Sequence, residues 1–240
     1  MNWFYKFLDK ILGSNTLYYP GCLTKVMIPE VEKNYEKLLE KIWIDFIKLE
    51  AQEYCCWSPV LRAGCKEDFE EIKRNNIEVL HQHAVSHIIT NCPACYNMLK
   101  YVYKLPEQGI EVEHITQTLY RNQNKLSKNE IKENITYHDP CHLGRQSGVY
   151  DEPREVIENT WCKIKEMVNN KELSSCCGGW WWLINANPEL SQKIAENTLN
   201  EVTSDKMVSP CPMCYYQFKT NAKNVQVVEF SELFLNNKDK

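Results

Sequence analysis

Ten of the twelve cysteines form a pattern that occurs twice in the chain. Each copy has a single cysteine, an adjacent Cys-Cys pair and a Cys-Pro-x-Cys motif, and corresponding cysteines lie 119 to 121 positions apart. The first set comprises Cys22, Cys55, Cys56, Cys92 and Cys95, and the second comprises Cys141, Cys176, Cys177, Cys211 and Cys214. Thiolates in such numbers select soft metal centres, above all iron–sulfur clusters or zinc. The sequence therefore predicts a tandem duplication of a five-thiol metal site.

Five cysteines per site favour an iron–sulfur cluster over zinc, because closed zinc sites take four ligands, commonly as two CxxC-type pairs. In an extended segment, neighbouring side chains point in opposite directions. An adjacent cysteine pair is therefore not expected to present both sulfurs to one compact cubane face, and it suits a larger or irregular cluster. Zinc stays open as the alternative cofactor, and thiol redox chemistry without a metal is a third reading.

The residues that follow the two Cys-Cys pairs differ. Gly178 and Gly179 follow the second pair, where they allow close approach of the backbone and offer amide hydrogens to sulfur. Trp57 follows the first pair instead. The two sites are therefore not identical in sequence.

Titratable and charged side chains flank the cysteine motifs. His138 and His142 lie on either side of Cys141, and we predict them as catalytic residues that donate a proton to a nascent thiolate or to cluster sulfur. A supporting hydrogen bond is the alternative role for both. Three further cations are candidates to meet an anionic substrate or to offset cluster charge, with simple solvation as the alternative. These are Lys25, Arg62 and Arg145.

Other cysteines and histidines lie outside the repeated pattern. Cys65 and Cys162 have no counterparts at matching offsets, and we expect both to be small buried side chains. His81, His83 and His87 have no cysteine spaced to join them, so they are not expected to form a metal site.

Composition limits the classes of function. The chain has 240 residues, of which 43% are hydrophobic and 25% charged, as is usual for a globular protein. A net charge of −4 gives no electrostatic reason to expect nucleic acid as a partner. No run of 18 apolar residues is present, and the first residues do not resemble a secretory signal. We therefore expect a cytoplasmic protein whose cysteines stay reduced or bind metal.

Short predicted strands alternate with predicted helices in both halves. The strands are expected at 16–19, 46–49, 86–90, 135–138, 164–168 and 206–209, and the helices at 29–44, 67–82, 152–160 and 188–202. This alternation predicts an α/β fold of two tandem, pseudo-symmetric repeats, each with a small, mostly parallel sheet flanked by helices. Most of the cysteine motifs come directly after predicted strands, where ligands gather in such sheets.

The repeats divide the chain into four predicted parts. Residues 1–14 are expected to form an amphipathic helix that packs on the protein itself, on a partner or on a membrane surface. Residues 15–122 form the first repeat, the polar segment 123–134 forms a linker, and residues 135–240 form the second repeat.

Several segments resemble the cysteine-rich CCG domain family. They are YYPGCLTKVMIPEV, CCWSPVLRAG, TNCPACY, TYHDPCHLGRQSGVYDEPREV, SSCCGG and SPCPMCY. The nearest members are two kinds of heterodisulfide reductase polypeptide, namely its catalytic subunit and the carboxy-terminal half of a second subunit. The resemblance extends over about 17–235, nearly the whole chain.

The resemblance implies that each five-cysteine set holds one non-cubane [4Fe–4S] cluster. It implies an oxidoreductase subunit that reduces a disulfide of the coenzyme M–coenzyme B type, with one sulfur at each of the two clusters. The alternative is an electron-transfer or adaptor subunit of a lactate, glycolate or succinate-type dehydrogenase. No CxxCxxCxxxCP run is present, so electrons are expected from a ferredoxin-like iron–sulfur subunit or a flavoprotein subunit. Membrane contact is expected only through a partner or the N-terminal helix.

Two features depart from the family pattern. Trp57 occupies the glycine position of the first motif, and Trp180, Trp181 and Trp182 follow Gly179 where relatives often have small residues. A cavity between the two sites would favour disulfide chemistry, whereas a site filled by tryptophan would favour electron relay.

Overall fold

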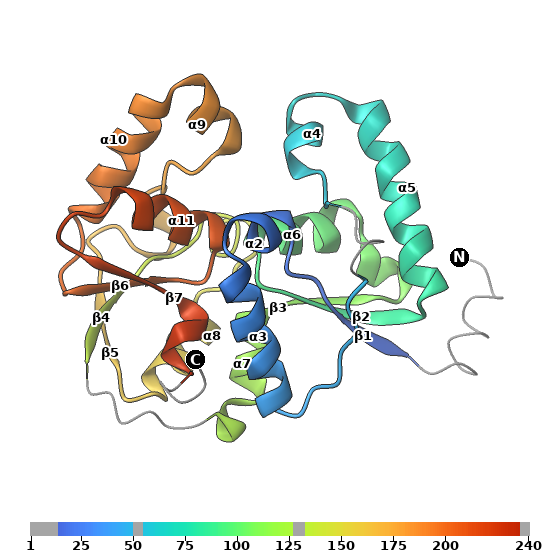
Figure 1. Ribbon diagram of the computed structural model, residues 1–240, viewed down its shortest axis with the longest axis horizontal. Coiled ribbons are helices and arrows are strands. Elements are labelled where there is room, and N and C mark those ends of the chain that lie inside the picture. The colour runs from blue at the N-terminus through green and yellow to red at the C-terminus, as the bar shows by residue number, and fades with distance from the viewer. Residues whose placement is uncertain (1–13, 50–54, 127–132, 236–240) are drawn as a thin grey trace.

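Two parallel sheets, one in each half of the chain, form the framework of the protein (Figure 1). The computed structural model describes residues 14–49, 55–126 and 133–235. The predicted fold class is confirmed, since two parallel sheets carry helices in tandem repeats. Every strand pair within the described residues is parallel, so the chain must cross back between paired strands.

The first sheet contains β1 (Asn15–Tyr18), β2 (Val85–Thr90) and β3 (Glu111–His114), in the order β1-β2-β3. Beside β1, the predicted strand at 46–49 is reduced to a single parallel bridge between Ile47 and Leu17. Two backbone hydrogen bonds hold that bridge, which makes this segment an edge of the sheet and not a full strand.

The second sheet contains β4 (Asn134–Tyr137), β5 (Lys163–Glu166), β6 (Lys206–Ser209) and β7 (Gln226–Glu229). The order of its strands is β5-β4-β6-β7. The strand that leads to Cys141, β4, therefore lies inside the sheet. When the Ile47 bridge is placed beside β1, the first sheet has the same order. The two repeats therefore share one topology.

Helices connect the strands and cover the sheets. The α-helices are α2 (Cys22–Met27), α3 (Pro29–Lys41), α4 (Ser58–Arg62), α5 (Lys66–Gln82), α6 (Pro93–Asn97), α7 (Ile115–Arg121), α8 (Asp151–Glu158), α9 (Trp181–Ala186), α10 (Pro188–Leu199) and α11 (Pro212–Asn221). Short turns of other helical types are η2 (Met98–Val102), η3 (Leu105–Gln108), η4 (Gln123–Lys125), η5 (Lys171–Leu173) and η6 (Phe230–Leu233). The four predicted helices correspond to α3, α5, α8 and α10, although α3, α8 and α10 end two or three residues earlier than expected.

One hydrophobic core joins the two repeats. Tyr18, Tyr35 and many aliphatic side chains of the first repeat pack in the same cluster as Tyr137 and Phe234 of the second. Helices α3, α7 and α8 lie between the sheets in Figure 1 and supply much of this cluster. Two further clusters fill the outer faces, one under α5 and one under α10 and α11. The repeats are therefore packed together by buried apolar surface, which is the main stabilising contribution in folding.

Two predicted parts lie wholly or partly outside the described residues. The N-terminal amphipathic helix falls on residues of which 1–13 are not described, and the linker includes 127–132. The four boundaries drawn from the sequence stay predictions. Across the described ranges, no helix combines the length and the apolar composition needed to span a bilayer.

Candidate functional site

All ten patterned cysteines line one cavity of about 390 Å³. The topology brings them together, because the carboxyl ends of parallel strands meet at one edge of each sheet. Cys92 and Cys211 come two residues after β2 and β6, and Cys22 and Cys141 follow β1 and β4 at the same edges. The two edges face each other, so both cysteine sets open into a single space.

The first cysteine set is closely packed without a disulfide. The Sγ atoms of Cys22 and Cys55 lie 3.5 Å apart, and those of Cys56 and Cys95 also lie 3.5 Å apart. Gly21 has a φ of +78°, and a Cβ there would lie 2.9 Å from the Cys95 sulfur. Only glycine allows the β1 loop to approach the Cys-Pro-Ala-Cys turn so closely.

The second cysteine set is packed in the same way. Its thiols also affect one another, because interaction with Cys176 raises the pKa of the Cys141 thiol and interaction with Cys177 raises the pKa of the Cys214 thiol. The backbone N–H groups of Gly178 and Gly179 approach the sulfurs of Cys176 and Cys177 at 3.4 and 3.3 Å. Both amides therefore contact the sulfurs of the adjacent cysteine pair, and a contact with cluster sulfide stays a prediction.

Both members of each adjacent cysteine pair line the cavity. In the first set they contact different partners, Cys55 with Cys22 and Cys56 with Cys95. The chain turns directly after each pair. Gly178 has a φ of 73°, and Trp57, at the corresponding position, adopts the same left-handed conformation with a φ of 56°. The Trp57 N–H also approaches the Cys55 sulfur at 3.4 Å. The tryptophan therefore keeps the turn of the glycine, at the cost of backbone strain.

Close packing of the thiols lowers the pKa of one cysteine in each set. Hydrogen bonds with Cys55 and Cys95 lower the pKa of the Cys56 thiol to about 5. Hydrogen bonds with Cys141 and Cys177 lower the pKa of the Cys176 thiol to about 2. The close packing therefore favours the thiolate form of one cysteine in each set, and the thiolate is the form of cysteine that binds metal.

The two predicted histidines occupy different environments. His142 lines the cavity, and its Nδ1 lies 3.3 Å from the Cys141 sulfur. Burial, followed by the nearby Arg62, lowers the pKa of His142 to about 4. His138 is buried outside the cavity wall, with its ring nitrogens on the Ser209 hydroxyl and the Ser175 carbonyl. The structure therefore places only His142 against the cavity, and a catalytic role for either stays a prediction.

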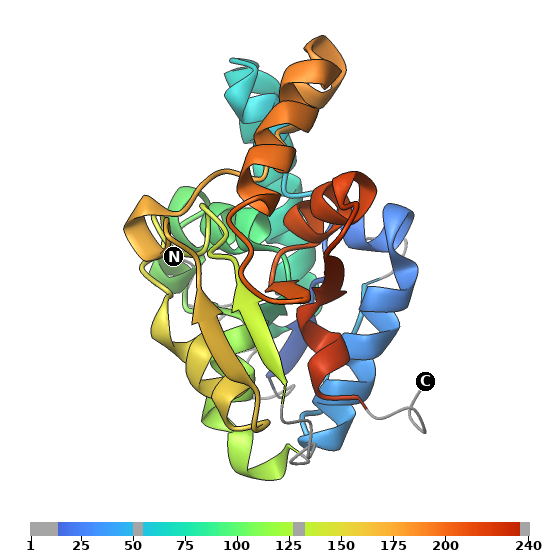
Figure 2. The ribbon, with the colours of Figure 1, turned by 90° about the vertical axis from the view of Figure 1, so that its left-hand side faces the viewer.

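Side chains from both repeats meet over the cavity. The Arg62 guanidinium of α4 lies 5.3 Å from the centre of the Trp180 ring, and the indole N–H of Trp182 donates to the Pro59 carbonyl at 3.4 Å. Trp180 and Trp181 form part of the cavity wall and leave its interior open. Figure 2 shows α9 and α10 rising at the same end of the molecule as α4 and α5.

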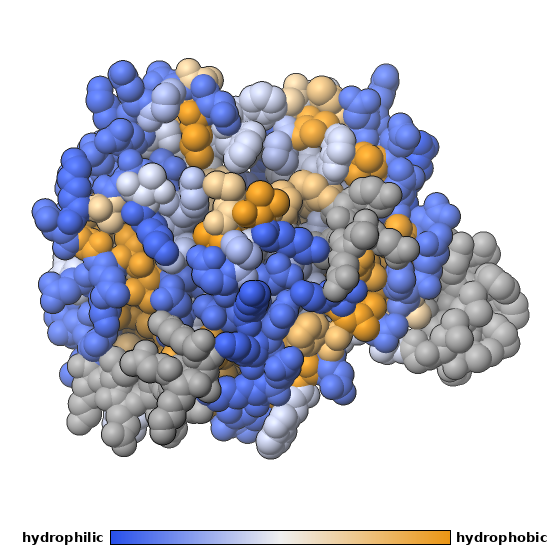
Figure 3. Space-filling view, viewed as in Figure 1, coloured by the Kyte–Doolittle hydropathy of each residue, from blue (hydrophilic) through white to orange (hydrophobic). Residues whose placement is uncertain are grey.

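The cavity has an apolar rim on α2. Val26 and Met27 line it and are 75% and 43% exposed, and Trp181 across from them is 51% exposed. Figure 3 shows apolar side chains gathered over α2 in the middle of this face. The other predicted cations are farther from the interior: Lys25 lies on α2, and Arg145 donates to the Ser174 carbonyl at 2.5 Å.

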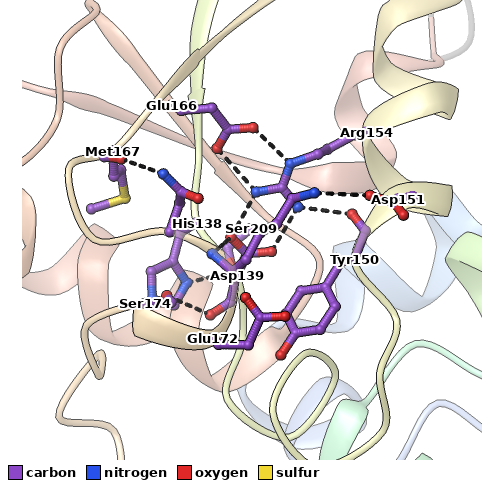
Figure 4. Close-up of polar contacts among 12 residues, drawn as sticks. His138, Asp139, Tyr150, Asp151, Arg154, Glu166, Met167, Glu172, Ser174 and Ser209 are labelled. Carbon is purple, nitrogen blue, oxygen red and sulfur yellow. Dashed lines mark hydrogen bonds and ion pairs between the residues drawn. The ribbon is translucent and has the colours of Figure 1, made fainter.

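A buried ion-pair network supports the second cysteine set (Figure 4). Both carboxylate oxygens of Asp139 accept hydrogen bonds from Arg154, at 2.8 and 2.7 Å, and Arg154 also binds Glu166 on β5. Asp139 accepts the Lys171 N–H, and its carbonyl accepts the Ser174 hydroxyl. The network ties the Cys141 loop to the Cys176 loop. Sequence reasoning missed it, and the only signal was an aspartate two residues before Cys141.

Residues outside the pattern were predicted only in part. Cys162 is buried as expected, whereas Cys65 is exposed at the start of α5. His87 lies with Glu111 and Glu113 in a group whose ligand atoms are within 4.8 Å of one another. Glu113 already accepts the Thr118 hydroxyl and pairs with Arg121 on α7. None of these three residues lines the cysteine cavity, and the Glu113 carboxylate already has two partners.

The fold and the site define a duplicated α/β protein whose two halves enclose one thiol-lined cavity. The chain matches the model of the CCG cysteine-rich domain twice, over residues 16–100 and 135–219. It belongs to the CCG cysteine-rich domain family.

Curated relatives resemble the chain over most of its length. It is 29% identical over 225 residues to a subunit of the dihydromethanophenazine:CoB–CoM heterodisulfide reductase of Methanosarcina acetivorans, covering 87% of this chain and 54% of the relative. It is 29% identical to an uncharacterized iron-sulfur protein of Methanocaldococcus jannaschii, covering 86% and 41%. It is 26% identical to a subunit of the fumarate reductase (CoM/CoB) of Methanothermobacter marburgensis, covering 92% and 46%. The chain thus spans about half the length of these relatives.

Among solved structures, glutamate racemase RacE1 of Bacillus anthracis aligns with 92% of this chain and 79% of its own length. The TM-score is 0.40 at 15% identity, which supports no argument about function.

Proposed function

We propose that this protein is an iron–sulfur subunit of an oxidoreductase that reduces a disulfide between two [4Fe–4S] clusters of the non-cubane type. Cys22, Cys55, Cys56, Cys92 and Cys95 would hold one cluster, and Cys141, Cys176, Cys177, Cys211 and Cys214 would hold the other. The observation that carries the proposal is the single cavity lined by both sets. Its relatives include proteins named as iron–sulfur proteins and heterodisulfide reductase subunits.

The donor set fits an iron–sulfur group. All twelve cysteines are free thiols although several sulfurs lie 3.5 Å apart, and backbone N–H groups approach the sulfurs of Cys55, Cys176 and Cys177. Such N–H groups stabilise the negative charge that thiolates and sulfides concentrate. The free thiols also support a location in the cytoplasm, where cysteines stay reduced.

The cavity suits chemistry that needs two electrons and little water. When bound, two clusters that each exchange one electron would supply the electron pair that a disulfide requires. The chain's own residues provide a wall that includes proline, leucine, methionine and tryptophan, with His142 as the one titratable group besides the cysteines among the described residues that line it. His142 holds a ring nitrogen against the Cys141 sulfur, and we expect it to donate a hydrogen bond to that sulfur or to a leaving thiolate. Electrons would arrive from a partner iron–sulfur or flavoprotein subunit.

Anaerobic purification followed by iron and acid-labile sulfide analysis tests the cofactor. We expect iron and sulfide in equal amounts and two distinct paramagnetic signals. Cys56→Ala should remove one signal and Cys176→Ala the other. Stoichiometric zinc without sulfide would overturn the proposal, and loss of both signals in either variant would indicate one shared centre. Cys65→Ala, an exposed cysteine away from the cavity, is the matched control and should change neither signal.

The second candidate is an electron-transfer subunit without its own substrate. The tryptophans favour it, because Trp180 and Trp181 form part of the wall of the cavity that both cysteine sets line. Adding small disulfides to the reduced protein separates the two functions. Oxidation of both signals with release of free thiol supports reduction at the cavity, whereas oxidation only by a protein partner supports relay.

A further inference from the structure

A chain of contacts crosses from the first repeat to a cysteine of the second. A guanidinium NH2 of Arg62 lies 3.3 Å from Nε2 of His142. The other ring nitrogen, Nδ1, lies 3.3 Å from the Cys141 sulfur. The imidazole therefore bridges a cation of α4 and a predicted cluster ligand.

The identity of the donor decides where the imidazole proton is. A guanidinium has only donors, so Nε2 of His142 must accept and carry no hydrogen. The single ring proton of the neutral imidazole is then on Nδ1, and it points at the Cys141 sulfur. We infer that Arg62 is a positioning residue that fixes the Nδ1–H tautomer of His142 and thereby directs an N–H···S hydrogen bond to Cys141. This inference rests on the proposed function for its consequence, although the contacts themselves do not.

Arg62 is held in place by an aromatic side chain and not by a carboxylate. Its guanidinium lies 5.3 Å from the centre of the Trp180 ring, and within the described residues it forms no ion pair. The nearby contact from Trp182 to the Pro59 carbonyl ties α4 to α9. A cation held over an aromatic face keeps its N–H donors for another partner, here the imidazole.

The first cysteine set has no equivalent donor at the matching position. The residue after Cys22 is Leu23, which also lines the cavity but has no hydrogen-bond donor in its side chain. Hydrogen bonds to ligand sulfur and nearby positive charge favour the reduced form of an iron–sulfur centre. The second site should therefore have the higher potential and accept the first electron, although both sites have the same five thiols.

Redox titration followed by paramagnetic resonance tests this in the intact holoprotein. The two signals are assigned through Cys56→Ala and Cys176→Ala. Arg62→Met removes charge and donor, and we expect it to move the second-site potential to more negative values with little change at the first site, which belongs to the same repeat as Arg62. Arg62→Lys keeps a donor and should restore most of the shift. Arg74→Met, on the exposed side of α5, is the control and should change neither potential.

A double-mutant cycle separates positioning from charge. If Arg62 acts through the imidazole, Arg62→Met should have little effect when His142→Ala is already present. An equal shift in both backgrounds would mean that Arg62 acts by charge alone and would overturn the inference. A shift of both sites together would also overturn it. Absence of any cluster would instead refute the proposed function.

A second measurement needs no cluster. Long-range ¹⁵N–¹H nuclear magnetic resonance of the cluster-free protein reports which imidazole nitrogen carries hydrogen, with His142 assigned through His142→Gln. We expect Nδ1–H in the unmodified chain and a change toward Nε2–H, the usual tautomer in water, in Arg62→Met. An Nε2–H ring in the unmodified chain would overturn the inference.

Discussion

The two repeats hold the same five thiols by different means. In the second, the loops on either side of Cys141 and Cys176 are joined by the buried Arg154 network. In the first, the ion pairs of Lys48 with Glu32 and Glu36 are partly exposed and join the segment beside β1 to α3, not one cysteine loop to another. The residue of the first repeat that corresponds to Asp139 is Pro20, whose side chain cannot accept a hydrogen bond. The shared topology therefore sets where the sulfurs meet, while each repeat stabilises its loops locally.

The largest expected difference concerns these two ion-pair groups. Arg154→Met leaves Asp139, which is 2% exposed, without its cation, and we expect a loss of about 3–5 kcal/mol in the free energy of unfolding. Lys48→Met removes a partly exposed cation and should cost about 1 kcal/mol or less. Chemical denaturation of the cluster-free protein measures both. Similar losses would show that the repeats are supported equally after all.

A second contrast lies where β3 and β7 end. His114 and Glu229 each begin a helical turn with a capping box, and both side chains are fully buried. Burial lowers the pKa of His114 to about 3 and raises the pKa of Glu229 to about 7. Protonation of His114 is therefore opposed in the folded state, and so is ionisation of Glu229.

The two groups should give stability opposite dependences on pH. The contribution of neutral His114 to the free energy of unfolding is complete above about pH 6.5 and falls as the pH decreases toward 3. The contribution of neutral Glu229 is complete below about pH 4.5 and falls as the pH rises through 7. Between about pH 4.5 and 6.5 the slopes, each about 1.4 kcal/mol per pH unit, should nearly cancel.

Single variants should reveal the pH dependence that His114 and Glu229 each give to the free energy of unfolding. Relative to the unmodified chain, Glu229→Gln should lose about 3 kcal/mol as pH falls from about 6.5 to 4.5. His114→Asn, which keeps a capping oxygen, should lose a similar amount, about 3 kcal/mol, as pH rises from about 4.5 to 7. Denaturation across this range gives the curves, and the curve of the double variant should again run parallel to that of the unmodified chain. Parallel curves for all four proteins would refute the contrast.

The smallest expected effect concerns the turn after each Cys-Cys pair. Gly178→Ala introduces a Cβ 2.5 Å from the Ser191 carbonyl at a positive φ, and it should cost about 1–2 kcal/mol in backbone strain alone. It should also weaken metal binding at the second site only. Trp57→Gly relieves strain but loses packing against the first-repeat core, so its net effect should be within about 1 kcal/mol. Thermal unfolding and metal content distinguish the two, and a larger loss at Trp57 would reverse the comparison.

The sequence predicted the features that depend on pattern. Strand and helix periodicity located α3, α5, α8 and α10, and the cysteine motifs after predicted strands correctly indicated convergence at the sheet edges. The strand at 46–49 was overestimated, since Lys48 turns to the carboxylates of α3 and the ladder stops after one bridge. Arg154 and Arg62 act on partners brought near by folding, so no spacing in the sequence indicated their roles.

The single hydrophobic core shared by the repeats has a mechanical consequence. Because Tyr35 of α3 packs in this core and donates to the Glu229 carboxylate at 2.7 Å, the halves cannot swing apart as hinged bodies. Fragments cut between residues 127 and 132 should stay associated, because interior packing holds the separation between the two sulfur sets constant.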